Sequence, residues 1–441
     1  MYLAYSLLLA AAFVVALPFY LWKGRGTGKY LPSFRERMGG PPASLANGNA
    51  PSVWIHAVSV GEVLTARILV APLKERFPLH RLFLSTTTAT GRAVAERSVT
   101  GADGLFFAPF DWPSPVRKAL DRVRPALLVL VETEIWPNLI HEAHRRGVRV
   151  VIVNGRISPR SFGRYRAVRG LLRRVLAEVD LFLMQSEPHA DRARQIGAPP
   201  GRIRALGNLK YDALGDTPAP AELGRLLGEG AEGRPLWVAG STVAGEEPMV
   251  LAAFREVRSR VPGARLLIAP RHPERFGEVA GLVEPAGFRA ERRSALGSAP
   301  WEGEVLLLDT LGELARVYAL ATVVFVGGSL VSAGGHNILE AAVAGKPIVV
   351  GPHMENFQEI ADEFQAEGAL RVVLSGEELG REVAGLLADP ARRAALGGAA
   401  RAIVVRNRGA LARTVDALAE LLGAEPPLFP GGGEGRLRGR G

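Results

Sequence analysis

The chain has 441 residues, of which 48% are hydrophobic and 22% charged, and it contains no cysteine. That length is enough for two or three domains with cores of their own, and the ordinary charged fraction excludes a wholly disordered chain. The lack of cysteine excludes disulfides, thiol catalysis, iron–sulfur clusters and cysteine-bound zinc. The net charge of +10 fits nucleic acid, an anionic membrane surface or phosphorylated ligands, and does not choose among them.

The first 22 residues carry no charge and predict a helix that crosses a membrane. At 1.5 Å per residue this helix would be about 33 Å long, against a hydrocarbon core of about 30 Å. Basic residues follow the apolar run instead of preceding it, which argues against a cleaved signal peptide and places the rest of the chain in the cytoplasm. A helix lying in the membrane plane and a helix buried in the soluble body are the alternatives.

Short apolar runs alternate with helical stretches after residue 51. The runs are continuous, as is typical of parallel strands covered on both faces. The stretches between them, such as Gly61–Phe77 and Asn138–Arg146, are long enough for crossover helices. The predicted strands are Val53–Ala57, Leu82–Ser85, Ala126–Val131, Val148–Val153, Leu181–Gln185, Leu236–Ala239, Leu266–Ala269, Val305–Asp309, Val323–Val326 and Ile348–Val350.

This rhythm predicts an α/β protein with two Rossmann-like domains, whose ligands bind at the carboxyl ends of the strands. One closing helix near Arg401–Gly423 is grouped with the second domain, and packing back on the first domain is its alternative. The predicted segments are a transmembrane anchor (1–22), a basic linker (23–50), the first domain (51–213), an interdomain linker (214–235), the second domain with the closing helix (236–425) and a disordered tail (426–441).

Three glutamates in the first domain are candidates for acid–base chemistry. Glu62 lies at the start of a predicted helix, where the helix dipole favours the ionised carboxylate that a general base requires. A cap that only stabilises the helix is the alternative for this residue. Glu132 and Glu134 follow a buried strand and share a face, so that each perturbs the protonation of the other. For them, a turn before Pro137 is the alternative.

Two basic segments of the first domain are candidates for binding anions. Lys210, in GNLKYD, lies where the first domain ends and could stabilise a departing phosphate. Arg156, Arg160 and Arg164 are spaced four apart and would share a helical face toward phosphates. A solvated surface is the alternative for both segments, and Pro159 indicates that the arginine segment begins as a loop.

Four Gly-rich or polar segments of the second domain each follow a predicted strand. Such turns present backbone N–H groups to phosphate, and Glu340 could accept hydrogen bonds from ribose. No Walker A sequence is present, and His141 and His144 do not form an HExxH motif, so P-loop hydrolysis and a metal site are not expected. The segments are Gly240–Glu247, Ala269–Phe276, Asp309–Leu314 and Gly327–Pro352.

In order and spacing, these motifs resemble those of the Kdo transferases (3-deoxy-D-manno-octulosonic acid transferases) of lipopolysaccharide assembly. The likeness extends from the N-terminal helix to the last helix. Its strongest pieces are VSVGEV, FAPFDWP, ETEIWPN, GNLKYD, PRHPERF, DTLGEL and GGHNILE.

The resemblance implies a GT-B glycosyltransferase whose two domains face a cleft. Such an enzyme is inverting, needs neither metal nor cofactor, and transfers Kdo from CMP-Kdo to a lipid A precursor (lipid IVA) at the cytoplasmic face of the inner membrane. No nucleic acid partner is expected. The family's general base matches Glu62, and its transition-state stabilising positions match Glu132 and Lys210. Its CMP-binding positions match Pro270, Arg271, Gly312, Glu313, Leu314, Asn337, Ile338, Leu339 and Glu340.

Some positions depart from the family pattern, and two other functions stay open. Val243 stands where the family usually has histidine, Gly155 where it commonly has alanine, and Ala341 where it commonly has proline. The first departure puts one hydrogen bond of the site in doubt. The alternatives are a GT-B enzyme that uses a UDP-sugar and a membrane-anchored protein that binds nucleic acid.

Overall fold

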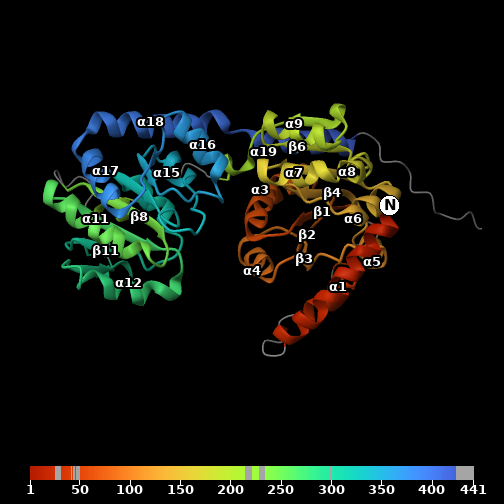
Figure 1. Cartoon of the computed structure of the whole chain (residues 1–441), viewed down its shortest axis with the longest axis horizontal. Coiled ribbons are helices and arrows are strands. Elements are labelled where there is room, and N and C mark those ends of the chain that lie inside the picture. Colours follow the sequence, from red (N-terminus) through yellow and green to blue (C-terminus); the bar gives the residue numbers. More distant parts are fainter. Residues whose placement is uncertain are drawn as a thin grey trace, which may run out of the picture. The chain divides into compact units, whose positions relative to one another are not determined.

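The computed structural model describes residues 1–24, 31–40, 42, 45, 50–213, 221–227, 234–297 and 299–423. The chain forms two compact α/β units (Figure 1): unit 1 comprises Met1–Ala213 with Arg408–Gly441, and unit 2 comprises Leu214–Asn407. Much of the two predicted linkers (23–50 and 214–235) and all of the predicted tail (426–441) lie outside the described residues.

Unit 1 is built on a seven-stranded parallel sheet with the strand order β3-β2-β1-β4-β5-β6-β7. Its central strands are buried on both faces, which explains their uninterrupted apolar sequences. The strands are β1 (Ser52–Ala57), β2 (Arg81–Thr86), β3 (Gly104–Phe107), β4 (Pro125–Val131), β5 (Arg149–Gly155), β6 (Leu181–Met184) and β7 (Ile203–Ala205).

Helices cover both faces of this sheet. One face packs against α5, α6, α8 and α9, and the other packs against α3, α4 and α19. The helices of unit 1 are α1 (Tyr2–Gly24), α2 (Leu31–Arg37), α3 (Val60–Arg76), α4 (Ala89–Ser98), α5 (Pro113–Val123), α6 (Pro137–Arg145), α7 (Pro159–Ala167), α8 (Arg169–Leu176), α9 (Glu187–Ile196) and α19 (Ala410–Gly423), with short 3-10 turns η2 (Pro200–Arg202) and η3 (Leu209–Tyr211).

Unit 2 repeats this plan with the strand order β10-β11-β9-β8-β12-β13-β14, again parallel throughout. The strands are β8 (Leu236–Thr242), β9 (Arg265–Pro270), β10 (Ala290–Arg292), β11 (Val305–Leu307), β12 (Val323–Val326), β13 (Ile348–Val350) and β14 (Arg371–Val372). The helices are α10 (Ala221–Leu227), α11 (Glu246–Arg260), α12 (Phe276–Val283), α13 (Arg293–Leu296), α14 (Leu314–Leu320), α15 (Leu339–Val343), α16 (Gln358–Ala366), α17 (Gly376–Ala388) and α18 (Pro390–Asn407), with the 3-10 turn η4 (Pro273–Arg275).

The closing helix predicted near Arg401–Gly423 is two helices, and the second of them belongs to unit 1. Gly409 separates α18 from α19 with φ +92°, a conformation that glycine adopts without strain. The Asp212 carboxylate accepts hydrogen bonds from the backbone N–H groups of Gly409 (2.7 Å) and Leu411 (2.8 Å). The grouping of this segment with residues 236–425 is therefore corrected, because α19 packs on the sheet of unit 1.

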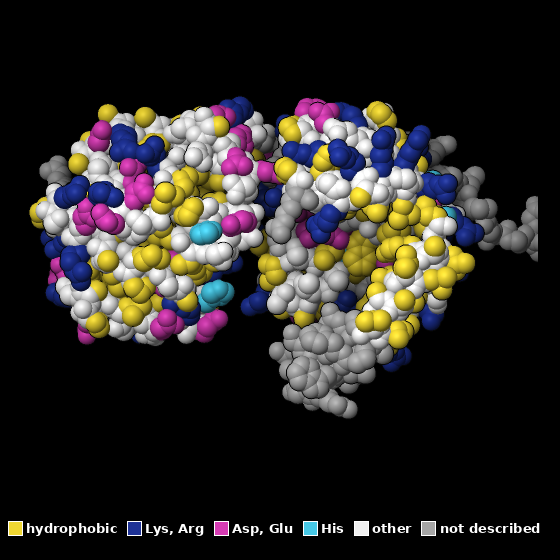
Figure 2. Space-filling model, viewed as in Figure 1, with side chains coloured by type: hydrophobic (Ala, Val, Ile, Leu, Met, Phe, Trp, Pro, Cys, Tyr) yellow, Lys and Arg dark blue, Asp and Glu magenta, His cyan; other side chains and the backbone are white. Residues whose placement is uncertain are grey.

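Helix α1 (Tyr2–Gly24) covers almost all of the segment for which the sequence predicts a membrane span. Within the described residues, no helix is long and apolar enough to cross a membrane. One side of α1 packs on unit 1: Tyr2 stacks on His141 and donates to Glu178 (2.7 Å), and Phe13 meets Trp112 edge to face. Figure 2 shows the opposite side of α1 as an apolar surface. Its exposed large residues are Leu3, Leu7, Leu8, Val14 and Val15.

Candidate functional site

The two sheets each reverse their strand order between two central strands. In unit 1 the reversal lies between β1 and β4, and in unit 2 it lies between β8 and β12. Ligands of open parallel sheets bind beside the carboxyl ends of the strands at such a switch point. The loop after β1 leads to Glu62, the loop after β4 begins with Glu132, and β8 ends in the predicted Gly-rich segment.

Glu62 is held by the first turn of α3. Ser59 caps this helix: its hydroxyl oxygen accepts from the Glu62 N–H and its hydroxyl donates to Glu62 Oε1 (2.8 Å). The Val58 N–H donates to Glu62 Oε2 (2.6 Å). This reciprocal arrangement is a capping box, and the side chain is only 8% exposed. The helix-capping interpretation is therefore correct as a description of the contacts, and it leaves the role as a base open.

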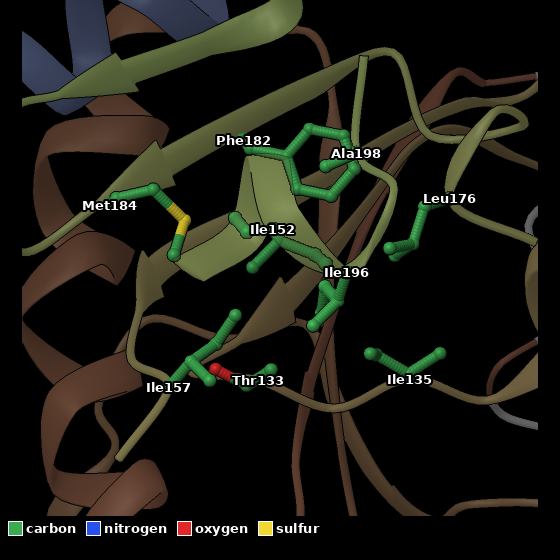
Figure 3. Close-up of a pocket in the computed structure, with 10 residues that line it drawn as sticks. Thr133, Ile135, Ile152, Ile157, Leu176, Phe182, Met184, Ile196 and Ala198 are labelled. Carbon is green, nitrogen blue, oxygen red and sulfur yellow. The ribbon is translucent and has the colours of Figure 1, made fainter. Parts of the chain in front are cut away.

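The loop after β4 places two glutamates on one side and apolar residues on the other. The Glu132 N–H donates to the Val153 carbonyl (2.8 Å), which extends the strand, and Glu132 then turns with φ +60°. Thr133 points the opposite way and accepts from the Arg156 N–H (2.8 Å). Figure 3 shows Thr133 and Ile135 facing a small apolar cavity. The non-glycine residue at positive φ is a strained position of the kind that clusters at functional sites.

Lys210 is brought to the glutamates by a short turn. The Asn154 Oδ1 atom accepts from the Leu209 N–H (3.0 Å), and the Asn208 side chain accepts from the Lys210 N–H (3.0 Å). Lys210 Nζ then lies 3.7 Å from Glu132 Oε1. Asn154 itself has φ +56°, a conformation that asparagine tolerates better than most residues. The structure thus brings Glu132 and Lys210 together, as an ion pair.

The three carboxylates perturb one another electrostatically. The pKa of Glu62 is raised from 4.5 to about 7, mainly by burial and then by the nearby charges of Glu134 and, less strongly, Glu132, against the lowering effect of the Val58 and Ser59 hydrogen bonds. Burial also raises the pKa of Glu134, while the Trp136 hydrogen bond lowers it and Glu132 raises it. A base with a pKa near neutrality is well matched to proton abstraction at physiological pH.

The arginine segment does not form the predicted single helical face. Helix α7 begins at Pro159, so Arg156 lies in the loop before it while Arg164 lies on the helix. The Arg160 side chain lies outside the described residues. Burial raises the pKa of Tyr165 on α7, with a further contribution from the charge of Glu134, so this helix borders the glutamate site.

In unit 2 the predicted nucleotide-binding residues form two groups. The first joins the end of β9 to α15: the Arg271 N–H donates to the Thr242 carbonyl (2.8 Å), and its guanidinium lies close enough to Glu340 to lower the pKa that burial raises. Asn337 also hydrogen-bonds Glu340 and accepts from the Leu339 N–H (3.1 Å). Pro270 ends β9, and Ile338 and Leu339 are buried in the core, which leaves Arg271, Asn337 and Glu340 as the polar members.

The second group is the loop that enters α14. Gly312 adopts φ +83°, and Glu313 is held by Arg293 (3.1 Å) and by the Thr310 hydroxyl before Leu314 starts the helix. Helix α14 packs against α15 and β8. Beside this helix, a side chain at Gly240 would collide with the Tyr318 hydroxyl, so glycine is required there.

Metal binding finds no support in the part of the chain that the structure describes. No group of three or more histidines, aspartates or glutamates there could hold a metal ion.

Comparison with known proteins decides the family. The family described as 3-deoxy-D-manno-octulosonic-acid transferase (kdotransferase) matches residues 32–213. The 3-deoxy-D-manno-octulosonic acid transferase of Haemophilus influenzae is 35% identical over 394 residues, which cover 88% of this chain and 92% of the relative. That of Bordetella pertussis is 41% identical over 394 residues, covering 87% and 89%. The chain belongs to the 3-deoxy-D-manno-octulosonic acid (Kdo) transferase family. It is a glycosyltransferase.

Solved structures share the two-unit fold of this Kdo transferase. The UDP-GlcNAc 2-epimerase of Neisseria meningitidis, solved with UDP-GlcNAc, is 12% identical and covers 84% of this chain and all of its own, with a TM-score of 0.57. At this identity the likeness concerns the fold alone. The C-terminal CMP-Kdo binding domain of WaaA from Acinetobacter baumannii is 36% identical and covers 40% of this chain and 91% of its own, with a TM-score of 0.37.

One buried carboxylate of unit 2 is not among the candidate residues that the sequence identifies. Glu246, at the start of α11, is 0% exposed, and its carboxylate accepts four backbone N–H groups at 2.7–3.0 Å. This ties the end of β8 to the loop after β12. The only local signal is a pair of acidic residues in a first helical turn, which is common. The donors are Val243, Gly328, Ser329 and Leu330. Val243 thus contributes through its backbone, whichever side chain it carries.

Proposed function

We propose that this Kdo transferase moves Kdo from CMP-Kdo to a hydroxyl group of a lipid A precursor, lipid IVA, with inversion at the anomeric carbon. The observation that carries the proposal is Glu62: a carboxylate that is almost completely buried at the switch point of unit 1 and whose pKa burial raises to about 7. The family membership supplies the transferred sugar, and the resemblance of the sequence motifs to that family supplies CMP-Kdo as the donor.

The chemistry follows from the charges that develop during transfer. Glu62 takes the proton of the acceptor hydroxyl as its oxygen attacks the anomeric carbon of Kdo from the face opposite CMP. The bond from that carbon to the CMP phosphate oxygen breaks, so the sugar acquires cationic character and the phosphate leaves as an anion. Glu132 stabilises the first charge, and Lys210 and Arg271 stabilise the second.

The nucleotide is assigned to unit 2. Arg271 offers a cation for the phosphate, and the Glu340 carboxylate, positioned by Asn337, offers an acceptor for ribose hydroxyls. Helix α15 has only five residues, so its dipole contributes little and the side chains dominate the recognition of CMP. No metal or cofactor enters this mechanism.

We place the protein at the cytoplasmic face of the inner membrane, where α1 lies against the lipid surface. The support is the row of exposed leucines and valines along α1, together with the lipid nature of the acceptor. The net charge of +10 favours an anionic headgroup region.

Transfer from CMP-Kdo, generated in situ, to a tetraacylated lipid A precursor tests the proposal. The wild type is expected to transfer Kdo, and Glu62→Ala is expected to lose at least 100-fold in kcat while it still binds CMP, because a general base contributes about 10²–10⁴-fold. Glu378→Gln is the control, since Glu378 closes a similar capping box with Ser375 on α17, in unit 2.

Two results would contradict the proposal. Equal activity of Glu62→Ala and the wild type would remove Glu62 as the base. Binding of UDP without binding of CMP would favour the UDP-sugar alternative over a CMP-Kdo donor.

A further inference from the structure

Glu134 has an arrangement that the proposed mechanism does not use. It is half-buried, and its Oε2 atom accepts a hydrogen bond from the Trp136 indole N–H (2.7 Å). Glu132, two residues before it, has Lys210 as a counter-ion, whereas Glu134 forms no ion pair with any described residue. A half-buried carboxylate without a counter-ion among the described residues costs free energy, and a simple turn does not require such a residue.

The Trp136 indole that donates to Glu134 is itself held in place by a second aromatic ring. The Trp136 ring meets the His56 ring edge to face, with centroids 5.0 Å apart and an angle of 89°. His56 is fully buried in β1 and contacts Ser85 Oγ (2.9 Å). The first turn of α6, which follows Trp136, is held as well, because the Asp111 carboxylate accepts a hydrogen bond from the Leu139 N–H (2.8 Å). The N–H group of Trp136 is therefore a fixed donor, which favours the charged form of the carboxylate that it holds.

The neighbours of Glu134 show where its charge acts. Glu62 follows β1 and Glu134 follows β4, which are paired parallel strands, so both residues lie at the same edge of the sheet. The contact of His56 on β1 with Trp136 also joins the two segments, and the electrostatic effect of Glu134 on Glu62 exceeds that of Glu132. The other charged or titratable groups around the pair lie on the loop after β4, on η3, on β1 and on α7 with the loop before it. These groups are Glu132, Lys210, His56, Arg156, Arg164 and Tyr165.

We propose that Glu134 is a positioning residue for the base: held in its ionised form by Trp136, it places a fixed negative charge beside Glu62 and makes Glu62 a stronger proton acceptor. This inference rests on the proposed function, in which Glu62 takes the proton of the acceptor hydroxyl. Lys210 partly offsets the charge of Glu132, and Glu134 is the neighbour with the larger effect on Glu62.

The turn interpretation of Glu134 makes a different prediction from the electrostatic one. In Glu134→Gln the amide oxygen still accepts from the Trp136 N–H, so the loop keeps its hydrogen bond and loses only the charge. Trp136→Phe does the reverse, since the ring still packs on His56 but no longer donates. A residue that only shapes the turn would tolerate the first change and be sensitive to the second.

The first measurement is the pH profile of kcat for the wild type, Glu134→Gln, Trp136→Phe and the control Glu378→Gln. In Glu134→Gln the midpoint of the acidic limb is expected to fall by about one pH unit, and the plateau kcat to fall about 3–10-fold, as a weaker base requires. KM for CMP-Kdo should change less than twofold. Trp136→Phe should shift the midpoint in the same direction by less. An unmoved acidic limb in Glu134→Gln would overturn the proposal.

The second measurement needs no activity and separates this inference from the proposed function. Thermal unfolding is followed from pH 5 to pH 8.5 for the wild type, Glu62→Gln, Glu134→Gln and the double variant. Above pH 7.5 the Tm gain from Glu62→Gln should be at least halved when Glu134 is already glutamine, while at pH 5 the two effects should add. Additive effects at every pH would overturn the proposal. Non-additive effects in a protein that transfers no Kdo would uphold the coupling and remove the proposed function.

Discussion

Glu62 has the features expected under both of the interpretations that the sequence presents as alternatives, a helix cap and a proton acceptor. Its carboxylate closes the capping box of α3, and the same burial that makes these hydrogen bonds possible raises its pKa to about 7. The Val58 and Ser59 contacts oppose that rise, so the pKa of Glu62 is a balance in which burial and the neighbouring carboxylates dominate. A residue chosen only to cap a helix would remain exposed and ionised, as first-turn glutamates usually are.

The raised pKa makes a prediction about stability. Between pH 4.5 and pH 7 the native protein binds more protons at Glu62 than the unfolded chain, so this group lowers stability as pH rises through that window, by about 3 kcal/mol in total. Glu62→Gln removes this cost, and the lost charge–dipole interaction of about 0.3–1 kcal/mol is smaller. We expect Tm to rise by roughly 4 °C at pH 8 and to stay near that of the wild type at pH 4.5.

Glu378→Gln provides the comparison for this stability measurement. Glu378 accepts from the Leu374 N–H (2.8 Å) and caps α17 together with Ser375. It has the same helical position as Glu62 but lacks neighbours equivalent to Glu132 and Glu134. Its substitution should therefore leave Tm within about 1 °C of the wild-type value at both pH values. A fall in the Tm of Glu62→Gln at pH 8 would show that the caps outweigh the burial cost.

For Glu246 we expect the opposite effect of a substitution on stability, because four backbone N–H groups donate to its carboxylate. Removal of its carboxylate in Glu246→Ala leaves four backbone N–H groups without this partner, two of them buried and two part-buried, which costs about 3 kcal/mol or more. We expect the transition of unit 2 to fall by about 8 °C or more in calorimetry. Glu256→Ala on the same helix is the control, since its ion pair with Arg260 is partly exposed and worth less than about 1 kcal/mol. Equal effects of the two variants would contradict this account.

At the scale of elements, the sequence predicts the interior of both sheets and misses their borders. All ten apolar runs identified in the sequence are strands, although several extend one to three residues further. The four missed strands, β3, β7, β10 and β14, are the outermost strands of the two sheets. They have two to four residues, a single neighbour and incomplete burial, so they carry no continuous apolar signal.

The same distinction explains which site residues could be predicted. Glu62 and Lys210 lie in local motifs, so their residue types and spacing reveal them as candidates. The hold of Trp136 on Glu134 depends on His56 packing from another strand, and the four N–H groups around Glu246 come from two loops about 80 residues apart in sequence. Such contacts follow from the tertiary fold, and no local pattern encodes them.

Helix α1 carries a prediction about the membrane. Leu7 and Leu8 are 62% and 72% exposed, and burying one leucine in lipid is worth about 1.5–3 kcal/mol. Leu7→Gln/Leu8→Gln should therefore weaken binding to vesicles with anionic headgroups at least tenfold in a sedimentation assay. Leu79→Gln serves as control, because Leu79 is 82% exposed in the turn between α3 and β2. Equal vesicle binding by the double variant and the wild type would exclude α1 as the contact.

At the scale of the whole molecule, the chain leaves unit 1 at residue 213 and returns to it at residue 408. Asp212 holds these two passages together through its bonds to Gly409 and Leu411. Asp212→Ala should loosen the start of α19, so we expect faster amide hydrogen exchange in α19 and in α3, which it covers, and unchanged exchange in unit 2.

Asp389→Ala is the matched change for that experiment. The Asp389 carboxylate accepts from the Arg392 N–H (2.9 Å) at the start of α18, within unit 2. Its effect on exchange should be confined to unit 2. Faster exchange in α3 with Asp389→Ala, or none with Asp212→Ala, would show that Asp212 does not hold α19 in place.

The return of α19 to unit 1 also governs how the protein is made. A ribosome adds about 5–20 residues per second, so α19 is synthesised roughly 10–70 s after the strands that it covers. During that interval the sheet face that carries α3 is missing Ala410, Val415 and Leu418, which complete its core. Unit 2 has all its residues before unit 1 does. The nascent chain therefore contains all of unit 2 before it contains all of unit 1, and unit 1, which carries Glu62, completes its core only after translation has passed through both units.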